Sequence, residues 1–213
     1  MIRKKSHLDH LISRLDTSIK TVAGGKTSSA RPTPAQNLSD TPLSESQKSH
    51  IARLMRVNHC GEVCAQALYE GQAFGSGSKD IASTLAQAAE EEEDHLYWCE
   101  KRIKEMGGRL SYLNPFFFVS SFAMGTLAGA LGRKINLGFL AATEEEVCRH
   151  LQRHLDDIPA DDMKTRAILK QMLEDEAGHA TTALHHGGAV YPPTVKKLMK
   201  SISDIMTRTV YWV

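Results

Sequence analysis

Two short motifs of the same kind, far apart in the chain, restrict the possible folds more than any other feature of this sequence. Each places a glutamate three residues before a histidine: Glu92 before His95 in "EEEDHLYWCEKR" (residues 91–102), and Glu176 before His179 in "LEDEAGHATT" (residues 173–182). Residues three apart share one face of an α-helix. Each motif therefore directs a carboxylate and an imidazole to the same side of a helix.

A further glutamate precedes each motif by about the length of a helical hairpin. Glu62 lies 30 residues before Glu92, and Glu144 lies 32 residues before Glu176. Ferritin-like bundles take one glutamate from each of two helices and one Glu-x-x-His motif from each of the other two, all directed inward. The sequence therefore predicts an all-α fold, a ferritin-like four-helix bundle with extra apolar, N-terminal and C-terminal helices.

The charges of this set indicate a dinuclear metal site. Four carboxylates carry four negative charges, which two divalent cations would balance, and a buried cluster of this kind without cations would be very costly. Mixed oxygen and imidazole ligands suit iron or manganese. A single Glu-x-x-His motif is weak, but its repetition predicts six metal ligands and no further catalytic residue: Glu62, Glu92, His95, Glu144, Glu176 and His179.

Other polar residues near these positions have weaker assignments. Asp175 lies four residues before His179 and is a candidate to hold a ligand histidine through its second ring nitrogen. His150 lies six residues after Glu144, roughly on the same side of the helix, and is a candidate to support the site. We expect the remaining nearby acids to lie on other, solvated faces: Glu90, Glu91, Glu93, Glu145 and Glu146.

Turn residues divide the rest of the chain into two regions. Residues 1–42 contain a short helical pattern followed by a Gly/Ser/Pro-rich linker, and residues 43–213 form the expected metal-binding domain. Helices are predicted within this domain over residues 43–75, 79–108, 135–159, 160–188 and 191–213, with an apolar segment between the second and third.

Charge and cysteine usage narrow the class of protein. The net charge is +1, so no basic field favours a nucleic acid partner. Four cysteines stand apart with no Cys-x-x-Cys pair, and the basic start of the chain has no apolar run. We therefore expect reduced thiols in a cytoplasm and no secretory signal.

The segment "PFFFVSSFAMGTLAGALG", residues 115–132, carries no charge and is followed by Arg133 and Lys134. Its length is close to the lower limit for a membrane span, but Ser, Thr and Gly make it only moderately apolar. Three interpretations stay open: a surface that dips into a membrane or holds an apolar ligand, a buried helix, and a true span.

The stretch "RVNHCGEVCAQALYEGQ", residues 56–72, resembles the signature of the demethoxyubiquinone hydroxylases. The matching positions are Arg56, Val57, His59, Gly61, Glu62, Tyr69, Gly71 and Gln72. "EDHL", "GTLAGALG", "ATEEEVCRHL" and "DEAGH" follow in the family's order, and the resemblance extends from about Leu43 to the C-terminus. Asn58 and Val63 depart from the pattern, which expects Asp and often an aromatic residue there.

This resemblance implies a di-iron enzyme of ubiquinone biosynthesis. The six residues above would hold two Fe²⁺ ions, and Tyr69 becomes a further candidate near them. The implied reaction is the O₂-dependent hydroxylation of a 2-polyprenyl-3-methyl-6-methoxy-1,4-benzoquinol. No nicotinamide or flavin fingerprint is present, so the reductant would be NADH at a weak site, a reductase, or the quinone itself. Other proteins of ubiquinone biosynthesis are implied as partners.

A polyprenyl substrate gives the apolar segment a use. Phe116 to Phe118 and the following helix would enter one leaflet, with Arg133, Lys134 and the basic N-terminus near lipid phosphates. We therefore expect peripheral attachment to the cytoplasmic face of the cell (inner) membrane. The alternatives are a ferritin-like iron-binding or storage protein, another di-iron or di-manganese oxidase, catalase or tRNA hydroxylase, and a membrane-associated bundle without chemistry.

Overall fold

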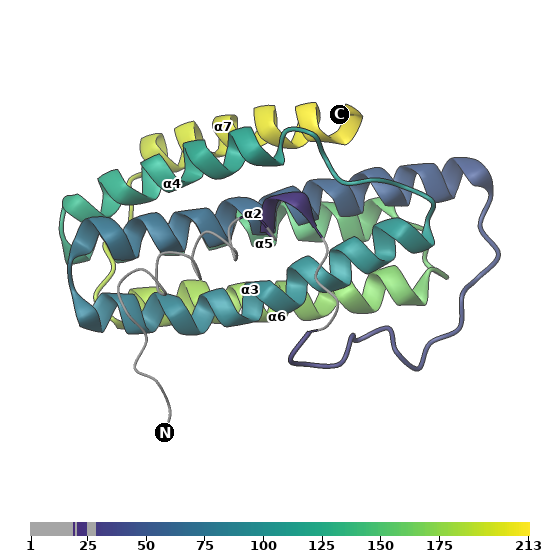
Figure 1. Ribbon diagram of the computed structural model, residues 1–213, viewed down its shortest axis with the longest axis horizontal. Coiled ribbons are helices and arrows are strands. Elements are labelled where there is room, and N and C mark those ends of the chain that lie inside the picture. The colour runs from purple at the N-terminus through teal and green to yellow at the C-terminus, as the bar shows by residue number, and fades with distance from the viewer. Residues whose placement is uncertain (1–18, 20, 25–28) are drawn as a thin grey trace, which may run out of the picture.

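The computed structural model describes residues 19, 21–24 and 29–213, and every regular element in this part of the chain is an α-helix. Figure 1 shows four long helices side by side, and these form the bundle: α2 (Glu45–Ser76), α3 (Lys79–Glu105), α5 (Arg133–Asp157) and α6 (Met163–His185). Two further helices, α4 (Asn114–Ala130) and α7 (Pro193–Trp212), lie along one side of it. The predicted all-α bundle with extra apolar and C-terminal helices is confirmed, whereas the expected N-terminal helix lies mostly outside the described residues.

Local sequence signals start and stop the helices of the bundle. The Ser44 hydroxyl accepts a hydrogen bond from the Gln47 amide at 3.3 Å, while the Gln47 side chain accepts one from the Ser44 amide at 2.8 Å. This reciprocal pair satisfies free amides at the start of α2. Gly77 ends the same helix with φ 58°, a left-handed conformation that glycine adopts without steric cost.

Glycines allow α4 to lie directly on the outer face of α2. A Cβ atom on Gly71 would approach the Phe122 carbonyl oxygen to 2.2 Å, and one on Gly125 would approach the Leu68 carbonyl oxygen to 2.3 Å. The buried residues of α4 are small or polar: Asn114, Ser121, Gly125, Ala128 and Gly129. Because the small residues face α2, several large apolar side chains of α4 are exposed, whereas Phe117 packs against Val57 and Val210.

This arrangement decides between the three interpretations of the apolar segment. Phe116, Val119 and Leu127 are each more than half exposed, at 64%, 68% and 67%, so α4 is not a buried helix. None of the helices within residues 29–213 combines the length and the hydropathy that a membrane crossing needs. A surface helix with an outward apolar face remains.

The interior of the bundle consists of two apolar clusters separated by the predicted ligand positions. One cluster contains Met55, Ile103, Leu155 and Leu169, and the other contains Leu68, Leu85, Leu140 and Ala183. On each of the four long helices, the predicted glutamate lies in sequence between the residues of one cluster and those of the other. The polar side chains are therefore held at the middle of the bundle by apolar packing on both sides.

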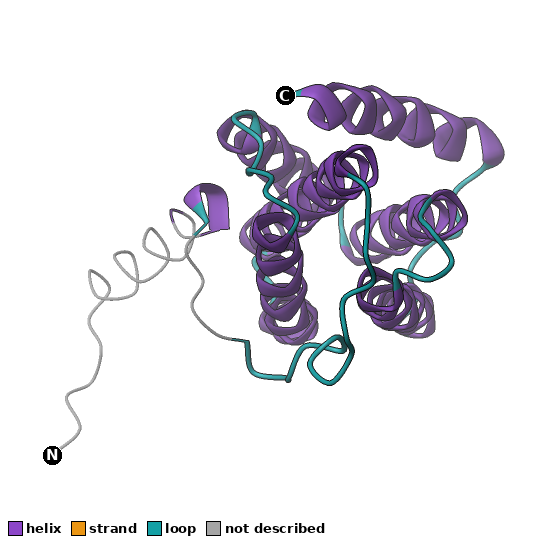
Figure 2. Ribbon diagram, turned by 90° about the vertical axis from the view of Figure 1, so that its right-hand side faces the viewer, coloured by secondary structure: helices purple, strands orange, loops and turns teal. Residues whose placement is uncertain are grey.

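Residues 29–42, here called the N-terminal strap, lie against the bundle instead of forming a free linker (Figure 2, the teal loop that follows the grey trace). Arg31 forms ion pairs with α3 and α6. At the other end of the strap, Asp40 pairs with Arg102 at 2.9 Å and with Lys164 at 2.7 Å. The Gly/Ser/Pro-rich composition had indicated a linker, but these long-range charge pairs fix part of it to the bundle.

Candidate metal centre

Two histidines and two glutamates form the middle of the candidate site. His95 Nδ1 lies 3.0 Å from Glu92 Oε2 and 3.2 Å from Glu176 Oε1. His179 Nδ1 lies 3.2 Å from Glu176 Oε2 and 3.4 Å from Glu92 Oε1. Each glutamate thus presents one oxygen to each histidine, so a cation held beside either ring would also meet an oxygen of both glutamates.

The remaining two glutamates lie on opposite sides of this group. Glu62 Oε2 is 3.9 Å from His95 Nδ1, and one ligand atom from each of Glu62, Glu92, His95 and Glu176 lies within 4.8 Å of the others. Glu144 is fully buried and is influenced electrostatically by His179, Glu92 and Glu176. The six side chains therefore divide into a His95 half with Glu62 and a His179 half with Glu144.

Tyr69 lies on the His179 side of the site, because it contacts Glu144 and the Glu92 oxygen that faces His179. Its hydroxyl donates to Glu144 Oε1 at 2.7 Å and to Glu92 Oε1 at 3.1 Å. The ring belongs to an apolar cluster and is 2% exposed, so its position is fixed by packing. The resemblance had indicated a supporting position for this residue, and the hydroxyl is in contact with two of the carboxylates.

The carboxylates repel one another in a site that is almost fully buried. Burial raises the pKa of Glu62 well above its ordinary value, and repulsion from Glu92 and Glu176 adds to this. Burial likewise raises the pKa of Glu144 well above its ordinary value, with repulsion from Glu176 and Glu92. Burial also opposes ionisation of Glu92, but hydrogen bonds from His179 and His95 outweigh it and hold the pKa of Glu92 well below its ordinary value.

The histidines respond to the same negative charge. Burial opposes protonation of both rings. Hydrogen bonds to Asp175, Glu176 and Glu92 outweigh it for His95 and raise its pKa well above the ordinary value. Those to Glu176 and Glu92 raise the pKa of His179 to about 11. Cations are therefore strongly favoured at this point of the bundle.

The second ring nitrogen of each histidine meets an acid from the opposite helix. His95 Nε2 lies 2.9 Å from Asp175 Oδ2, and His179 Nε2 lies 3.1 Å from Glu91 Oε2. Asp175 thus holds a histidine as expected, although the ring is His95 on α3 and not His179 on its own helix. Glu91, expected to be merely solvated, has the equivalent role for His179. Both acids immediately precede the glutamate of a Glu-x-x-His motif, and this shared position was the signal available in the sequence.

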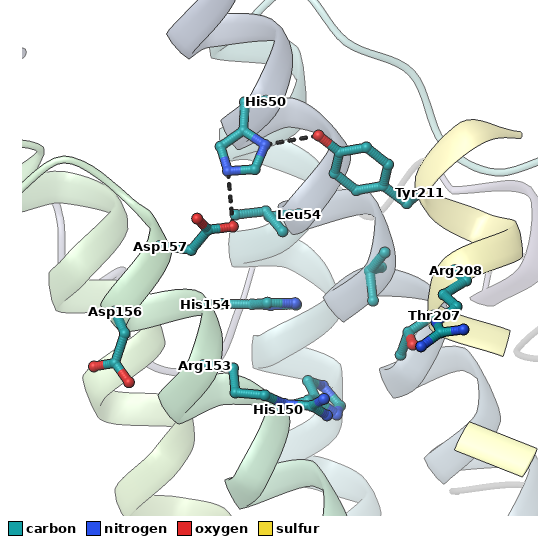
Figure 3. Close-up of a pocket in the computed structure, with 11 residues that line it drawn as sticks. His50, Leu54, His150, Arg153, His154, Asp156, Asp157, Thr207, Arg208 and Tyr211 are labelled. Atoms are coloured by element: carbon teal, nitrogen blue, oxygen red, sulfur yellow. Dashed lines mark hydrogen bonds and ion pairs between the residues drawn. The ribbon is translucent and has the colours of Figure 1, made fainter. Parts of the chain in front are cut away.

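Two other assignments differ from expectation. Glu146 was expected to be solvated but is 6% exposed and forms ion pairs with Arg149 and Arg153. Within the described residues, no hydrogen bond or ion pair joins His150 to the six side chains, and its Nδ1 has no hydrogen-bond partner. Its ring packs against His154 at 5.4 Å and faces a separate cavity of about 680 Å³ between α2, α5 and α7 (Figure 3). A helix position six residues from Glu144 is rotated far enough to face this neighbouring space.

The donor set suits a pair of divalent ions of the iron or manganese type. Its atoms are carboxylate oxygens and imidazole nitrogens, and no cysteine is among the clustered ligands of the described residues. Glu144 Oε2 is buried and has no hydrogen-bond partner within the part of the chain that is described. A buried carboxylate oxygen without a proton donor is explained if it binds a cation.

The bundle and its inward set of four glutamates and two histidines define a member of the ferritin-like class of helical proteins. Within that class, the chain belongs to the family described as ubiquinone biosynthesis protein COQ7, whose model matches residues 49–210.

Three proteins named 3-demethoxyubiquinol 3-hydroxylase are similar to this chain over nearly its whole length. Those from Legionella pneumophila (strain Paris), Nitrosococcus oceani and Nitrosospira multiformis are 49%, 47% and 51% identical. The matches cover 100%, 99% and 97% of this chain and 100%, 99% and 99% of the respective relatives. The similarity therefore also includes residues before Leu43, where the resemblance in the sequence had been expected to begin.

Proposed function

We propose that this chain is an O₂-dependent di-iron monooxygenase of ubiquinone biosynthesis that hydroxylates a 2-polyprenyl-3-methyl-6-methoxy-1,4-benzoquinol. The observation that carries the proposal is the buried set in which Glu92 and Glu176 each face both His95 and His179. The substrate class is supported by the relatives, which are named 3-demethoxyubiquinol 3-hydroxylase.

The proposed ligand assignment follows the two halves of the site. Glu62 with His95 and Glu144 with His179 would each hold one ion, and Glu92 and Glu176 would contact both. Bound ferrous iron would supply electrons to O₂. The protein orients the ligands through Tyr69, Asp175 and Glu91, whose hydrogen bonds reach Glu144, His95 and His179 respectively.

The reaction needs a source of two electrons. One oxygen atom of O₂ replaces a hydrogen on the ring as a hydroxyl group, and the other leaves as water. The balance consumes two electrons and two protons, which NADH at a weak site, a reductase or the quinol itself would supply. The proposal includes other proteins of ubiquinone biosynthesis as binding partners of this chain.

The cavity between α2, α5 and α7 is a candidate place for the quinol ring. It is lined by Val57, five residues before Glu62, and by His150, six residues after Glu144. With a rise of about 1.5 Å per residue, these positions lie roughly 8–9 Å along the helices from the ligands. His150 Nδ1 is buried without a hydrogen-bond partner in the described residues and could bind a ring hydroxyl. Figure 3 shows Tyr211 and Arg208 of α7 on the opposite wall.

We also propose peripheral attachment to the cytoplasmic face of the cell (inner) membrane. The exposed apolar side chains of α4 continue onto α7, where Leu198, Ile205 and Trp212 are 61%, 67% and 69% exposed. The two helices lie along the same side of the bundle (Figure 1). An apolar face of this kind, close to Arg133 and Lys134, suits a bilayer that contains anionic lipids and the polyprenyl tail.

The test is a reconstitution with ferrous iron under anaerobic conditions, followed by a demethoxyquinol analogue, a reductant and ¹⁸O₂. We expect one ¹⁸O atom in the ring by mass spectrometry, and none with the Glu176→Gln variant. Glu174→Gln is the matched control, because Glu174 is exposed on the same helix. Two bound irons without product would reject the hydroxylase, and a cage-sized assembly by light scattering would then favour iron storage.

A further inference from the structure

Arg31 of the N-terminal strap reaches two acids beside the metal centre. Its Nε donates to Asp94 Oδ2 at 2.8 Å, and its Nη2 pairs with Asp175 Oδ2 at 2.9 Å. The Ala30 amide also donates to Asp94 Oδ1 at 2.7 Å, and the guanidinium lies 5.0 Å from the centre of the Trp98 ring. The strap is thus attached to α3 and α6 together, at the level of the motifs.

The Asp175 oxygen that meets Arg31 is the same oxygen that meets His95. His95 Nε2 lies 2.9 Å from Asp175 Oδ2, while Gln171 donates to the other oxygen, Oδ1, at 3.0 Å. The Asp175 side chain is only 10% exposed. Its two oxygens have three partners, which are Arg31, His95 and Gln171. The contact between Arg31 and Asp175 is an ion pair, and an ion pair shielded from solvent is screened less than one at the surface, so Arg31 restricts the orientation of the Asp175 carboxylate.

The equivalent acid in the other half of the site lacks this restraint. Glu91 contacts His179 Nε2 at 3.1 Å, but its side chain is 36% exposed and lines a cavity of about 360 Å³. Within the described part of the chain, no arginine or lysine pairs with Glu91. The two halves, alike in sequence, therefore differ in how firmly their histidines are held.

We propose that Arg31 is a positioning residue that fixes Asp175, and through it His95, so that the His95 half retains its metal ion more firmly than the His179 half. This proposal rests on the metal centre proposed above. With Asp175 fixed, the His95 ring keeps its Nε2–H donor engaged and its Nδ1 directed at Glu62, Glu92 and Glu176. The N-terminal strap then becomes part of the metal centre and not only a cover for the bundle.

The experiment measures metal release and does not depend on turnover. Protein loaded anaerobically with two ⁵⁷Fe²⁺ ions is mixed with an excess of a chromogenic chelator, and the release of each ion is followed by absorbance. We expect Arg31→Gln to accelerate the release of one ion about tenfold, the lower end of the 10–100-fold loss seen when partners of metal ligands are changed. The Mössbauer doublet of one iron should change while the other stays as in the unmodified protein.

Three further variants separate positioning from general stability. Asp40→Asn loosens the far end of the strap, where Asp40 pairs with Arg102 and Lys164, and should leave both release rates unchanged. Arg31→Lys should release the ion more slowly than Arg31→Gln but faster than the unmodified protein, because a lysine can pair well with only one carboxylate. In an Asp175→Asn background, Arg31→Gln should add little, because both changes remove the same restraint.

The outcomes also distinguish this proposal from the one it rests on. If the unmodified protein binds fewer than two irons, the proposed metal centre fails and this inference fails with it. If it binds two irons and Arg31→Gln releases both at the original rates, only the role of Arg31 is overturned. Equal acceleration by Asp40→Asn and Arg31→Gln would likewise overturn it, since the strap would then act through stability alone.

Discussion

Lowering the pH should destabilise the protein through the two histidines in the cavity between α2, α5 and α7. Burial lowers the pKa of His150 to about 4, and the positive charge of Arg153 contributes. Burial likewise lowers the pKa of His154 to about 3, with contributions from His150 and Arg153. Both rings are therefore neutral in the folded protein over the whole neutral and mildly acidic range.

The groups around these rings explain why no acid compensates for burial. His154 Nδ1 donates to Asn58 Oδ1 at 2.9 Å, which is a neutral partner. Asp157 favours the charged form of His154, but its carboxylate is engaged with His50 at 3.1 Å. The remaining charged residues that line the cavity are Arg153, Asp156 and, from α7, Arg208.

The sign of the effect follows from proton uptake by the unfolded chain. An unfolded histidine has a pKa of about 6.5, so below that pH the unfolded chain binds protons that the folded protein refuses. The contribution of these two neutral histidines to the free energy of unfolding is fully present above about pH 6.5 and is lost as the pH falls below it. At pH 5, which is roughly 1.5 pH units below the unfolded pKa, each fully buried histidine lowers the free energy of unfolding by about 2 kcal/mol, at about 1.36 kcal/mol per unit. His154 is partly exposed, so we expect about 2–4 kcal/mol for the pair.

The assay compares urea unfolding of the metal-free protein at pH 8 and pH 5 with that of a His150→Gln/His154→Gln double variant. Glutamine does not titrate, and at position 154 it can still donate to Asn58. All other titrating groups are shared, so the difference between the two losses isolates the histidines. Between pH 8 and pH 5, we expect the free energy of unfolding of the unmodified protein to fall by about 2–4 kcal/mol more than that of the variant. Equal losses within about 1 kcal/mol would refute the reasoning that both rings are held neutral by burial.

Three further predictions concern the site, the packing of α4 and the membrane face. Tyr69→Phe should keep two irons per chain. It should destabilise the metal-free protein by about 1.5–3 kcal/mol in thermal unfolding, because two carboxylates lose a hydrogen-bond donor. Loss of iron from this variant would contradict a supporting role for Tyr69. Gly125→Val should separate α4 from α2 and cost at least about 1–3 kcal/mol in urea unfolding. Leu127→Asp and Leu198→Asp should each reduce binding to anionic vesicles in co-sedimentation, whereas Met163→Asp, exposed away from α4 and α7, should not.

The inward-facing set could be predicted from the sequence because it depends on distances along single helices. The spacing of Glu62, Glu92, His95, Glu144, Glu176 and His179 places each of them on an inward face if the helices are long and antiparallel. Apolar residues on both sides of each glutamate then fix the level at which these side chains meet. Long helices with strong periodicity are also the elements that local sequence determines best.

Contacts between different helices could not be predicted in the same way. Asp175 was assigned from its distance to His179, but its partner is His95, because the register of α3 against α6 decides which side chains meet. The pairing of Glu91 with His179 depends on the same register. The attachment of the N-terminal strap could not be predicted from its composition. Gly, Ser and Pro disfavour helices, but an arginine and an aspartate can still anchor an irregular segment to the bundle.

The position of α2 explains how one small bundle can combine a charged interior with an apolar exterior. Glu62 lies on its inner face, while Gly71 lies on its outer face against α4. A helix with its side chains is about 10–12 Å wide, so the apolar surface of α4 and the carboxylates are separated by roughly two helix diameters. A substrate with an apolar tail and a polar ring requires both environments within its own length. Under the proposed function, the close packing of α4 on α2 would let the tail remain at the surface while the ring enters the cavity between α2, α5 and α7.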